Sequence, residues 1–200
     1  MKRNAYSASA VKLAFWFQEF RKETELLQSG KSFDEIKQMS RDGNLFGTQS
    51  AARSTVIYNT VTKRIQILGD DFYSLFLDSD IATQKLFVLS GIMASDTLFF
   101  DFVYEVIREK LLIGSNTFTD ADIRIFFHNK QVQDETAAKW TDQTLGRLGK
   151  TYKQYLLNAG VTDDGRLERK ILKPILDPSF EHWLQDHEMA VIGKALSGEA

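Results

Sequence analysis

The amphipathic segment from Asp96 to Gly114 is apolar over a wide arc. At about 100° per residue, its aromatic and aliphatic side chains cover roughly 200° of a helix surface. Asp96 is a suitable N-cap and Gly114 a suitable helix stop. We therefore predict a central helix over 97–113 that other helices surround. Lys110 falls in the middle of the apolar arc, and we expect its side chain to reach an acidic partner or a bound phosphate.

The residues before this segment contain shorter apolar stripes with helix signals at their ends. The first stripe ends at Gly30, Ser32 opens a short helix with a capping box, and Thr48 is expected to cap a longer helix that continues to Leu68. A short helix, a turn and a longer helix form the layout of a helix-turn-helix. Ordinary packed helices show the same pattern, and the small residue usual early in the first helix is missing. Both interpretations stay open for residues 1–68.

Residues 69–200 are also mainly helical in pattern. The predicted helices cover 72–77, 81–93, 97–113, a helix opening at Thr119, 142–159, and a final pair between Pro178 and Leu196. The turn dipeptide Asp164-Gly165 favours one short β-hairpin near 161–168. The fold class that follows is all-α, mainly helical: a small N-terminal lobe resembling a helix-turn-helix (1–68) and a larger helical lobe (69–200).

The composition is that of a folded protein without disulfides. The chain of 200 residues is 43% hydrophobic, with fifteen Phe and no Cys, which excludes a disordered chain and a thiolate metal site. Apolar runs stay below the roughly 18 residues of a membrane span, and an apolar signal segment is missing from the start. We expect a cytoplasmic protein with no membrane partner.

Charge is segregated along the chain although the net charge is only −2. Residues 1–68 carry +5, residues 69–145 carry −7, residues 146–173 carry +4 and residues 174–200 carry −4. The basic blocks could face a polyanion, or they could pair with the acidic blocks. The sequence leaves these two interpretations balanced.

The residues that could contact nucleic-acid phosphates fall in three groups. They are Lys2 and Arg3 in a short N-terminal arm, Gln49, Arg53, Lys63 and Arg64 around the third predicted helix, and Arg147, Lys150, Lys153, Arg169 and Lys170 in the block 146–173. Arg147, Lys150 and Lys153 recur every three residues and so share roughly one helix face. Phosphate contacts of this kind give a salt-dependent and largely sequence-independent affinity.

Patterns that would indicate catalysis or cofactor binding are weak. Gly149-Lys150-Thr151 matches the end of a phosphate-binding loop, but the first Gly of that motif would stand at Thr144 and a helix is expected here instead of a strand. His182 and Asp186 are spaced as a surface pair rather than as metal ligands. The charged strip of the central helix, which contains Asp101, Glu105, Arg108 and Glu109, is interpreted as solvated. We expect no enzymatic activity, metal or cofactor.

Several short motifs together resemble those of the BrxA family of bacteriophage exclusion (BREX) systems, a family often labelled NusB-like. They are Tyr6-Ser7-Ala8, Asn44-Leu45-Phe46, the run from Phe102 to Leu111, Thr119-Asp-Ala-Asp122, Lys139-Trp140 and Leu176-Asp-Pro178. The resemblance covers nearly the whole chain, but the motifs consist of core and cap residues. It carries no catalytic residue over to this sequence.

The resemblance implies a helical, non-enzymatic protein of phage defence. Its implied partners are double-stranded DNA and the other BREX proteins, namely a DNA methyltransferase, an alkaline-phosphatase-like protein, an ATPase and a Lon-like protease. The first hypothesis is a DNA-binding accessory protein that uses the two basic blocks. The alternative is an adaptor that docks other BREX components through its acidic residues, and NusB-like RNA binding comes third.

Overall fold

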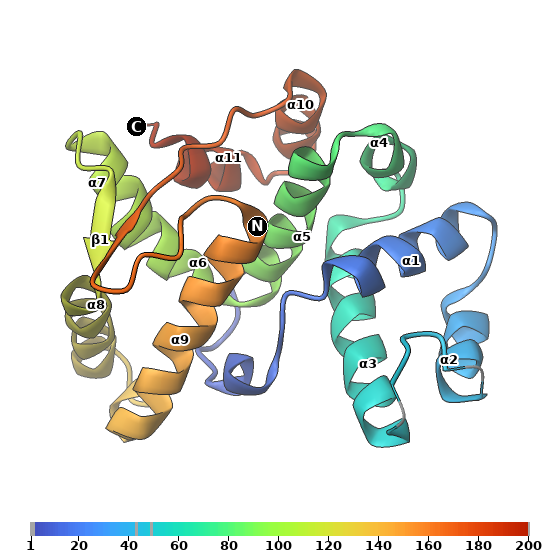
Figure 1. Cartoon of the computed structure of the whole chain (residues 1–200), viewed down its shortest axis with the longest axis horizontal. Helices are drawn as coiled ribbons and strands as arrows, with labels where there is room; N and C mark the ends of the chain where they lie inside the picture. The colour runs from blue at the N-terminus through green and yellow to red at the C-terminus, as the bar shows by residue number, and fades with distance from the viewer. Residues whose placement is uncertain (1–2, 43, 49, 200) are drawn as a thin grey trace.

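A computed structural model describes residues 3–42, 44–48 and 50–199 of the chain. The fold is mainly helical, as the sequence predicts. Two helices, α5 and α6, lie at its centre (Figure 1). The α-helices are α1 (Phe17–Gln28), α2 (Phe33–Asp42), α3 (Ala51–Leu68), α4 (Tyr73–Asp78), α5 (Ile81–Ser95), α6 (Thr97–Phe102), α7 (Glu109–Leu112), α8 (Asp120–Gln133), α9 (Asp142–Ala159), α10 (Pro178–Asp186) and α11 (Ala190–Ser197). Short 3₁₀ helices cover Ser9–Lys12 and Ala137–Lys139.

The predicted central helix is confirmed, but it is not a regular α-helix. Asp96 caps it by accepting a hydrogen bond from the Phe99 backbone N–H at 3.1 Å, and Gly114 follows its end with a positive φ of 75°. Between α6 and α7 the residues Val103–Arg108 form a π-helix, which we call the π segment. A π turn takes about one residue more than an α turn, so the residues after it lie about 100° behind the positions that α-helical spacing predicts.

This change of register explains why a lysine occurs at position 110, within the predicted apolar arc. With the π segment included, Lys110 moves from the middle of the apolar arc to its edge, where its ammonium pairs with Asp122 at 2.8 Å. The expected contact with an acidic partner is therefore confirmed. Ile113, which α-helical spacing places in the core, is exposed instead.

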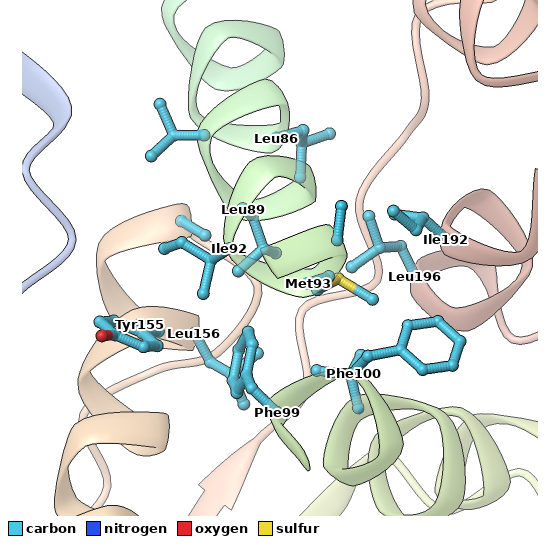
Figure 2. Close-up of a cluster of buried hydrophobic side chains, with 14 of the residues drawn as sticks. Leu86, Leu89, Ile92, Met93, Phe99, Phe100, Tyr155, Leu156, Ile192 and Leu196 are labelled. Atoms are coloured by element: carbon cyan, nitrogen blue, oxygen red, sulfur yellow. The ribbon is translucent and has the colours of Figure 1, made fainter. Parts of the chain in front are cut away.

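The main hydrophobic core is one cluster that draws on α1, on α3 to α6, on α8 to α11, on the π segment and on β1. All residues of α5 from Leu86 to Ala94 are buried, and α9, α6 and α11 surround its C-terminal half (Figure 2). Phe87 of α5 also contacts Phe180 and Trp183 of α10, at ring-centroid distances of 4.6 Å and 5.2 Å. A second small cluster, Ile36, Leu45 and Tyr58, joins α2 to α3. The division of the chain into two lobes at residue 69 stays a prediction.

The antiparallel β structure expected near 161–168 is present, with a different strand pairing. The strand β2 (Glu168–Lys170) pairs with β1 (Thr117–Thr119), with Phe118 opposite Arg169. The chain still reverses direction after Thr162, and an isolated antiparallel β-bridge pairs Thr162 with Ile171. The sheet therefore ties the end of the 146–173 block to the start of α8.

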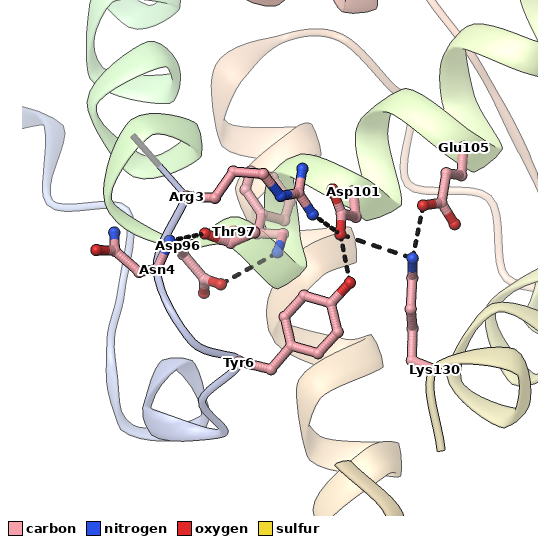
Figure 3. Close-up of polar contacts among 9 residues, drawn as sticks. Arg3, Asn4, Tyr6, Asp96, Thr97, Asp101, Glu105 and Lys130 are labelled. Atoms are coloured by element: carbon pink, nitrogen blue, oxygen red, sulfur yellow. Dashed lines mark hydrogen bonds and ion pairs between the residues drawn. The ribbon is translucent and has the colours of Figure 1, made fainter. Parts of the chain in front are cut away.

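The N-terminal arm, residues 3–16, is packed against the central helix. The backbone N–H of Asn4 donates to Thr97 Oγ1 at 2.7 Å, and Arg3 and Tyr6 both contact Asp101 (Figure 3). Trp16 then adopts a left-handed conformation, with φ of 55°, which ends the arm and begins α1.

Within the described residues, no single helix is long and apolar enough to cross a membrane. The pair made of α5 and residues 97–112 meets that test only when taken together, and it is bent by 112°.

Candidate nucleic-acid interface

A groove between α8 and α9 contains two of the predicted phosphate-binding residues. It has a volume of about 560 Å³, and both Lys150 and Lys153 line it from α9. Arg124 and His128 line it from α8. We call this the basic groove.

Close packing of the two helices forms the base of this groove. Gly149 is buried where α9 crosses α8, and a Cβ placed there would lie 3.0 Å from Cγ2 of Ile123. Leu148 and Tyr152 of α9 face the core beside it. Gly146 also lines the groove, but a Cβ placed there would have no neighbour within 4 Å. The crossing point therefore accounts for Gly149, while nothing in the structure explains Gly146.

The cations of the groove are not equivalent. Lys153 Nζ lies 2.7 Å from Asp120 Oδ1, so part of its charge is compensated within the protein. Lys150 is exposed, as is Arg147 one turn earlier on the same helix. No acidic partner contacts Lys150 or Arg147 within the described chain. These two side chains are therefore the most available phosphate contacts on α9.

Arg124 and His128 are groove residues that the sequence analysis missed. The signal was present, because Arg124, His128 and Gln131 recur at a helical spacing in a helix whose start was predicted. Thr119 opens that helix with a complete capping box to Asp122. Only the position of α9 shows that this stripe faces Lys150.

Arg169 and Lys170 lie on β2, outside the residues that line the basic groove. The Arg169 guanidinium donates to the Asp163 carbonyl O at 3.0 Å, so it holds the chain reversal. Lys170 is exposed and stands opposite Thr117 in the sheet. Because β1 leads directly into α8, the strand that carries Lys170 pairs with the residues just before the first turn of α8.

The candidates of the third predicted helix are separated by the structure. Arg53 is exposed in the first turn of α3, which Ser50 caps instead of the expected Thr48. Lys63 is exposed beside a second cavity of about 250 Å³ between α3, α5 and the N-terminal arm. Eight residues separate α2 from α3, whereas the turn of a helix-turn-helix has about 3–4.

Arg64 does not lie at the surface, in contrast to the prediction. Its guanidinium is buried, where it donates to the carbonyl oxygens of Ala14 at 3.0 Å and Phe15 at 2.9 Å. It also lies over the rings of Trp16 and Tyr155, at 5.6 Å and 5.8 Å from their centroids. Arg64 fixes the N-terminal arm and cannot contact DNA in this conformation.

The N-terminal candidates give a similar result. Arg3 pairs with Asp101 at 2.7 Å, although its side chain is still half exposed. Lys2 and Gln49 lie outside the described residues. The remaining cations of the first basic block are thus spread over α1 to α3 and do not line the groove of α8 and α9.

The charged strip of the central helix is solvated only at Glu105 and Glu109, and the prediction is wrong for Asp101 and Arg108. Asp101 is buried against Arg3, Tyr6 and Lys130. Arg108 is buried too, where its Nε donates to the Glu199 carbonyl O at 2.7 Å. The arm and α8 cover the first residue, and the C-terminal segment covers the second.

Two of the weaker motifs have the structure that the sequence predicts. Gly149-Lys150-Thr151 lies inside α9, so it does not follow a strand as a phosphate-binding loop does. His182 Nε2 and Asp186 Oδ2 form an exposed pair at 3.3 Å. Across the described ranges, no group of three His, Cys or acidic residues is placed to hold a metal ion.

A sequence model of the BrxA family matches residues 4–188 of this chain. A BREX protein BrxA from Bacillus cereus (strain H3081.97) is 34% identical over 177 residues, which cover 88% of each protein. The chain therefore belongs to the BrxA family and is a component of a BREX system.

A solved structure shares the fold. The crystal structure of an uncharacterized protein from Magnetospirillum magneticum matches with a TM-score of 0.82 at 16% identity, covering 98% of this chain and 100% of that one. At this identity the likeness concerns the fold alone.

Proposed function

We propose that this BrxA-family protein is a DNA-binding accessory protein of a BREX system and that duplex DNA contacts the basic groove. One observation carries the proposal: Arg124 of α8 and Lys150 of α9 line the same groove, and neither has an acidic partner in the described chain. Arg147 of α9 and Lys170 of β2 are further exposed cations, although Asp120 and Asp142 also line the groove. A role on bacterial DNA would place the protein in the cytoplasm.

The proposed binding acts on the DNA backbone. Arg and Lys side chains at the groove can contact phosphates and release counterions, which gives affinity without base recognition. The lining residue Phe127 is buried in the core, so His128 supplies the one exposed ring among the described lining residues, and an extended stacking platform for single strands is missing. We therefore propose a non-enzymatic protein that binds duplexes of unrelated sequence with similar affinity.

The test is fluorescence anisotropy with two duplexes of unrelated sequence. Affinity should fall by roughly tenfold or more between about 50 and 200 mM salt if two or three phosphates are contacted. Both duplexes should behave alike. Binding that is absent at low salt, or insensitive to salt, would overturn the proposal. Stronger competition by a structured RNA than by duplex DNA would favour the NusB-like RNA-binding hypothesis.

An adaptor that docks other BREX proteins is a second candidate. The observation that favours it is a group of exposed isoleucines beside carboxylates on the opposite side of α8 from the basic groove. Pull-downs with other BREX proteins, with and without nuclease, separate the two functions. An association that depends on bridging DNA disappears after nuclease treatment, whereas direct docking survives.

A further inference from the structure

The second side of α8 faces another groove, which α7 and the π segment complete. It has a volume of about 330 Å³, and the residues that line it include Glu105, Glu109, Ile113, Asp122 and Ile125. We call it the acidic groove. Nothing in the proposed DNA binding uses it.

Large apolar side chains are exposed at this groove. Ile113 is 75% exposed and Ile125 is 61% exposed, one on each wall. Val132, 75% exposed, continues the stripe seven residues after Ile125, which is two turns along the same face of α8. An apolar stripe of this kind on a helix face is typical of a surface that a partner covers.

The exposure of Ile113 follows from the backbone. The π segment delays the helix by about one residue, which turns Ile113 out of the core and brings Leu111 toward it, where Leu111 meets Gly198. π turns are frequent at functional sites, and Glu105 and Val106 of this one line the acidic groove.

Two of the cations near the isoleucines lie beneath their carboxylate partners, whereas Lys110 lines the groove itself and pairs with Asp122 at 2.8 Å. Lys130 is buried and contacts the half-exposed Glu105 at 2.5 Å. Arg108 is buried and contacts the half-exposed Glu109 at 2.9 Å. Glu105 and Glu109 are therefore more exposed than Lys110, so a partner that packs on the isoleucines meets these two carboxylates first.

We infer that the acidic groove docks a basic amphipathic helix of a partner protein. Leucine-type side chains of that helix would pack on Ile113 and Ile125, and its lysines or arginines would pair with Glu105 and Glu109. DNA is excluded as the occupant because its phosphates would meet these carboxylates. The inference rests on the second candidate function and specifies the chemistry of the partner.

The experiment uses the full chain, with its isoleucine methyl groups isotopically labelled, and a synthetic amphipathic helix of leucine and lysine as the probe. We expect the NMR signals of Ile113 and Ile125 to shift on titration, and salt to weaken binding. A peptide of leucine and glutamate with the same pattern should not bind. The double variant Ile113→Ser/Ile125→Ser should lose about tenfold or more in affinity, and Glu109→Lys should also weaken binding.

Ile175→Ser is the matched control, because Ile175 is 96% exposed and lies in the loop before α10. It should bind the lysine peptide like the unmodified chain. The inference is overturned if the peptide does not bind, if the shifts centre on the basic groove, or if Ile175→Ser loses as much affinity. A dimer that dissociates in the double variant would overturn it in favour of a second copy as the occupant.

The remaining outcomes separate this inference from the functions on which it depends. A nuclease-resistant association that persists in the double variant would reject the acidic groove and keep the adaptor function. Loss of all nuclease-resistant association in the unmodified chain would reject both. DNA affinity should be the same in the double variant and the unmodified chain, because the two grooves lie on different sides of α8.

Discussion

The carboxylate of Asp101 and the ammonium of Lys130 lie 3.6 Å apart, and each side chain is only 5% exposed. Asp101 also accepts hydrogen bonds from Arg3 at 2.7 Å and Tyr6 at 2.6 Å. The N-terminal arm, the central helix and α8 therefore meet at one buried carboxylate, as Figure 3 shows.

Removing one partner of this pair should destabilise the protein. Lys130→Met is expected to lower the free energy of unfolding by about 3 kcal/mol, near the low end for a broken buried pair, because Arg3 and Tyr6 still contact Asp101. Lys130→Met/Asp101→Asn should lose less than the sum of the two single variants, since the second change removes the stranded charge. Urea unfolding of the four proteins measures this. Additive losses would show that Lys130 and Asp101 are not coupled.

Glu23 gives a prediction for pH. It is buried in α1 beside Thr62, and burial raises its pKa to about 8, against the hydrogen bond from Thr62, which lowers it. Between about pH 4.3, the pKa of an unfolded glutamate, and pH 8, the Glu23 carboxyl group is therefore protonated in the folded state and ionised in the unfolded state. The folded state binds more protons in this window, so the contribution of Glu23 to stability is complete below about pH 4.3 and decreases up to about pH 8.

Glu23→Gln keeps the shape of this side chain without its titration. As the pH rises from about 6 to 8, the unmodified chain should lose roughly 1.4 kcal/mol of unfolding free energy per pH unit relative to Glu23→Gln. Urea unfolding at three pH values within this window provides the measurement. A difference that stays constant with pH would contradict the raised pKa. Asp96, whose pKa burial raises to about 6, titrates in both proteins and cancels in the comparison.

The two glycines of α9 make a matched pair for stability. Gly146→Ala should raise the free energy of unfolding by up to about 1 kcal/mol, because alanine favours a helix and the new methyl group meets nothing. Gly149→Ala has the same helical gain but forces Ile123 to move, so it should be less stable than Gly146→Ala. Thermal unfolding of both variants checks the order. Equal stability would show that α8 can move away from α9 without cost.

Three variants that each remove one positive charge can assign DNA binding to one part of the molecule. Arg147→Gln and Lys150→Gln should each reduce the slope of log affinity against log salt by about 0.9. Arg53→Gln in α3 should leave the slope unchanged. The reverse result, in which Arg53→Gln alone reduces the slope, would assign DNA binding to the α2–α3 pair and reject the basic groove.

The helix ends were predictable because they depend on neighbours in sequence. The Ser32 box is formed, with its backbone N–H 2.8 Å from Glu35 Oε2, and Asp96 caps the central helix as predicted. The α9 bounds of 142–159 also agree with the prediction. Such caps need only a few residues at fixed spacing.

The buried charges were not predictable in the same way. The helix periodicity assigned Asp101 to a solvated strip, but its neighbours in space come from the arm, 98 and 95 residues earlier, and from Lys130 of α8. Arg64 shows the same limit, because the carbonyl groups it contacts are about 50 residues earlier. Only the tertiary structure brings these groups together, and the same holds for Arg124 opposite Lys150.

The π segment has a consequence for comparing this chain with its relatives. A π turn in an otherwise α-helical element is equivalent to one additional residue. A relative whose central helix is α-helical throughout would correspond to this chain only if a one-residue gap is placed between Val103 and Arg108. Without that gap, every position from Glu109 to the end of α7 would be paired with a residue on a different face, and Ile113 would be compared with a core position.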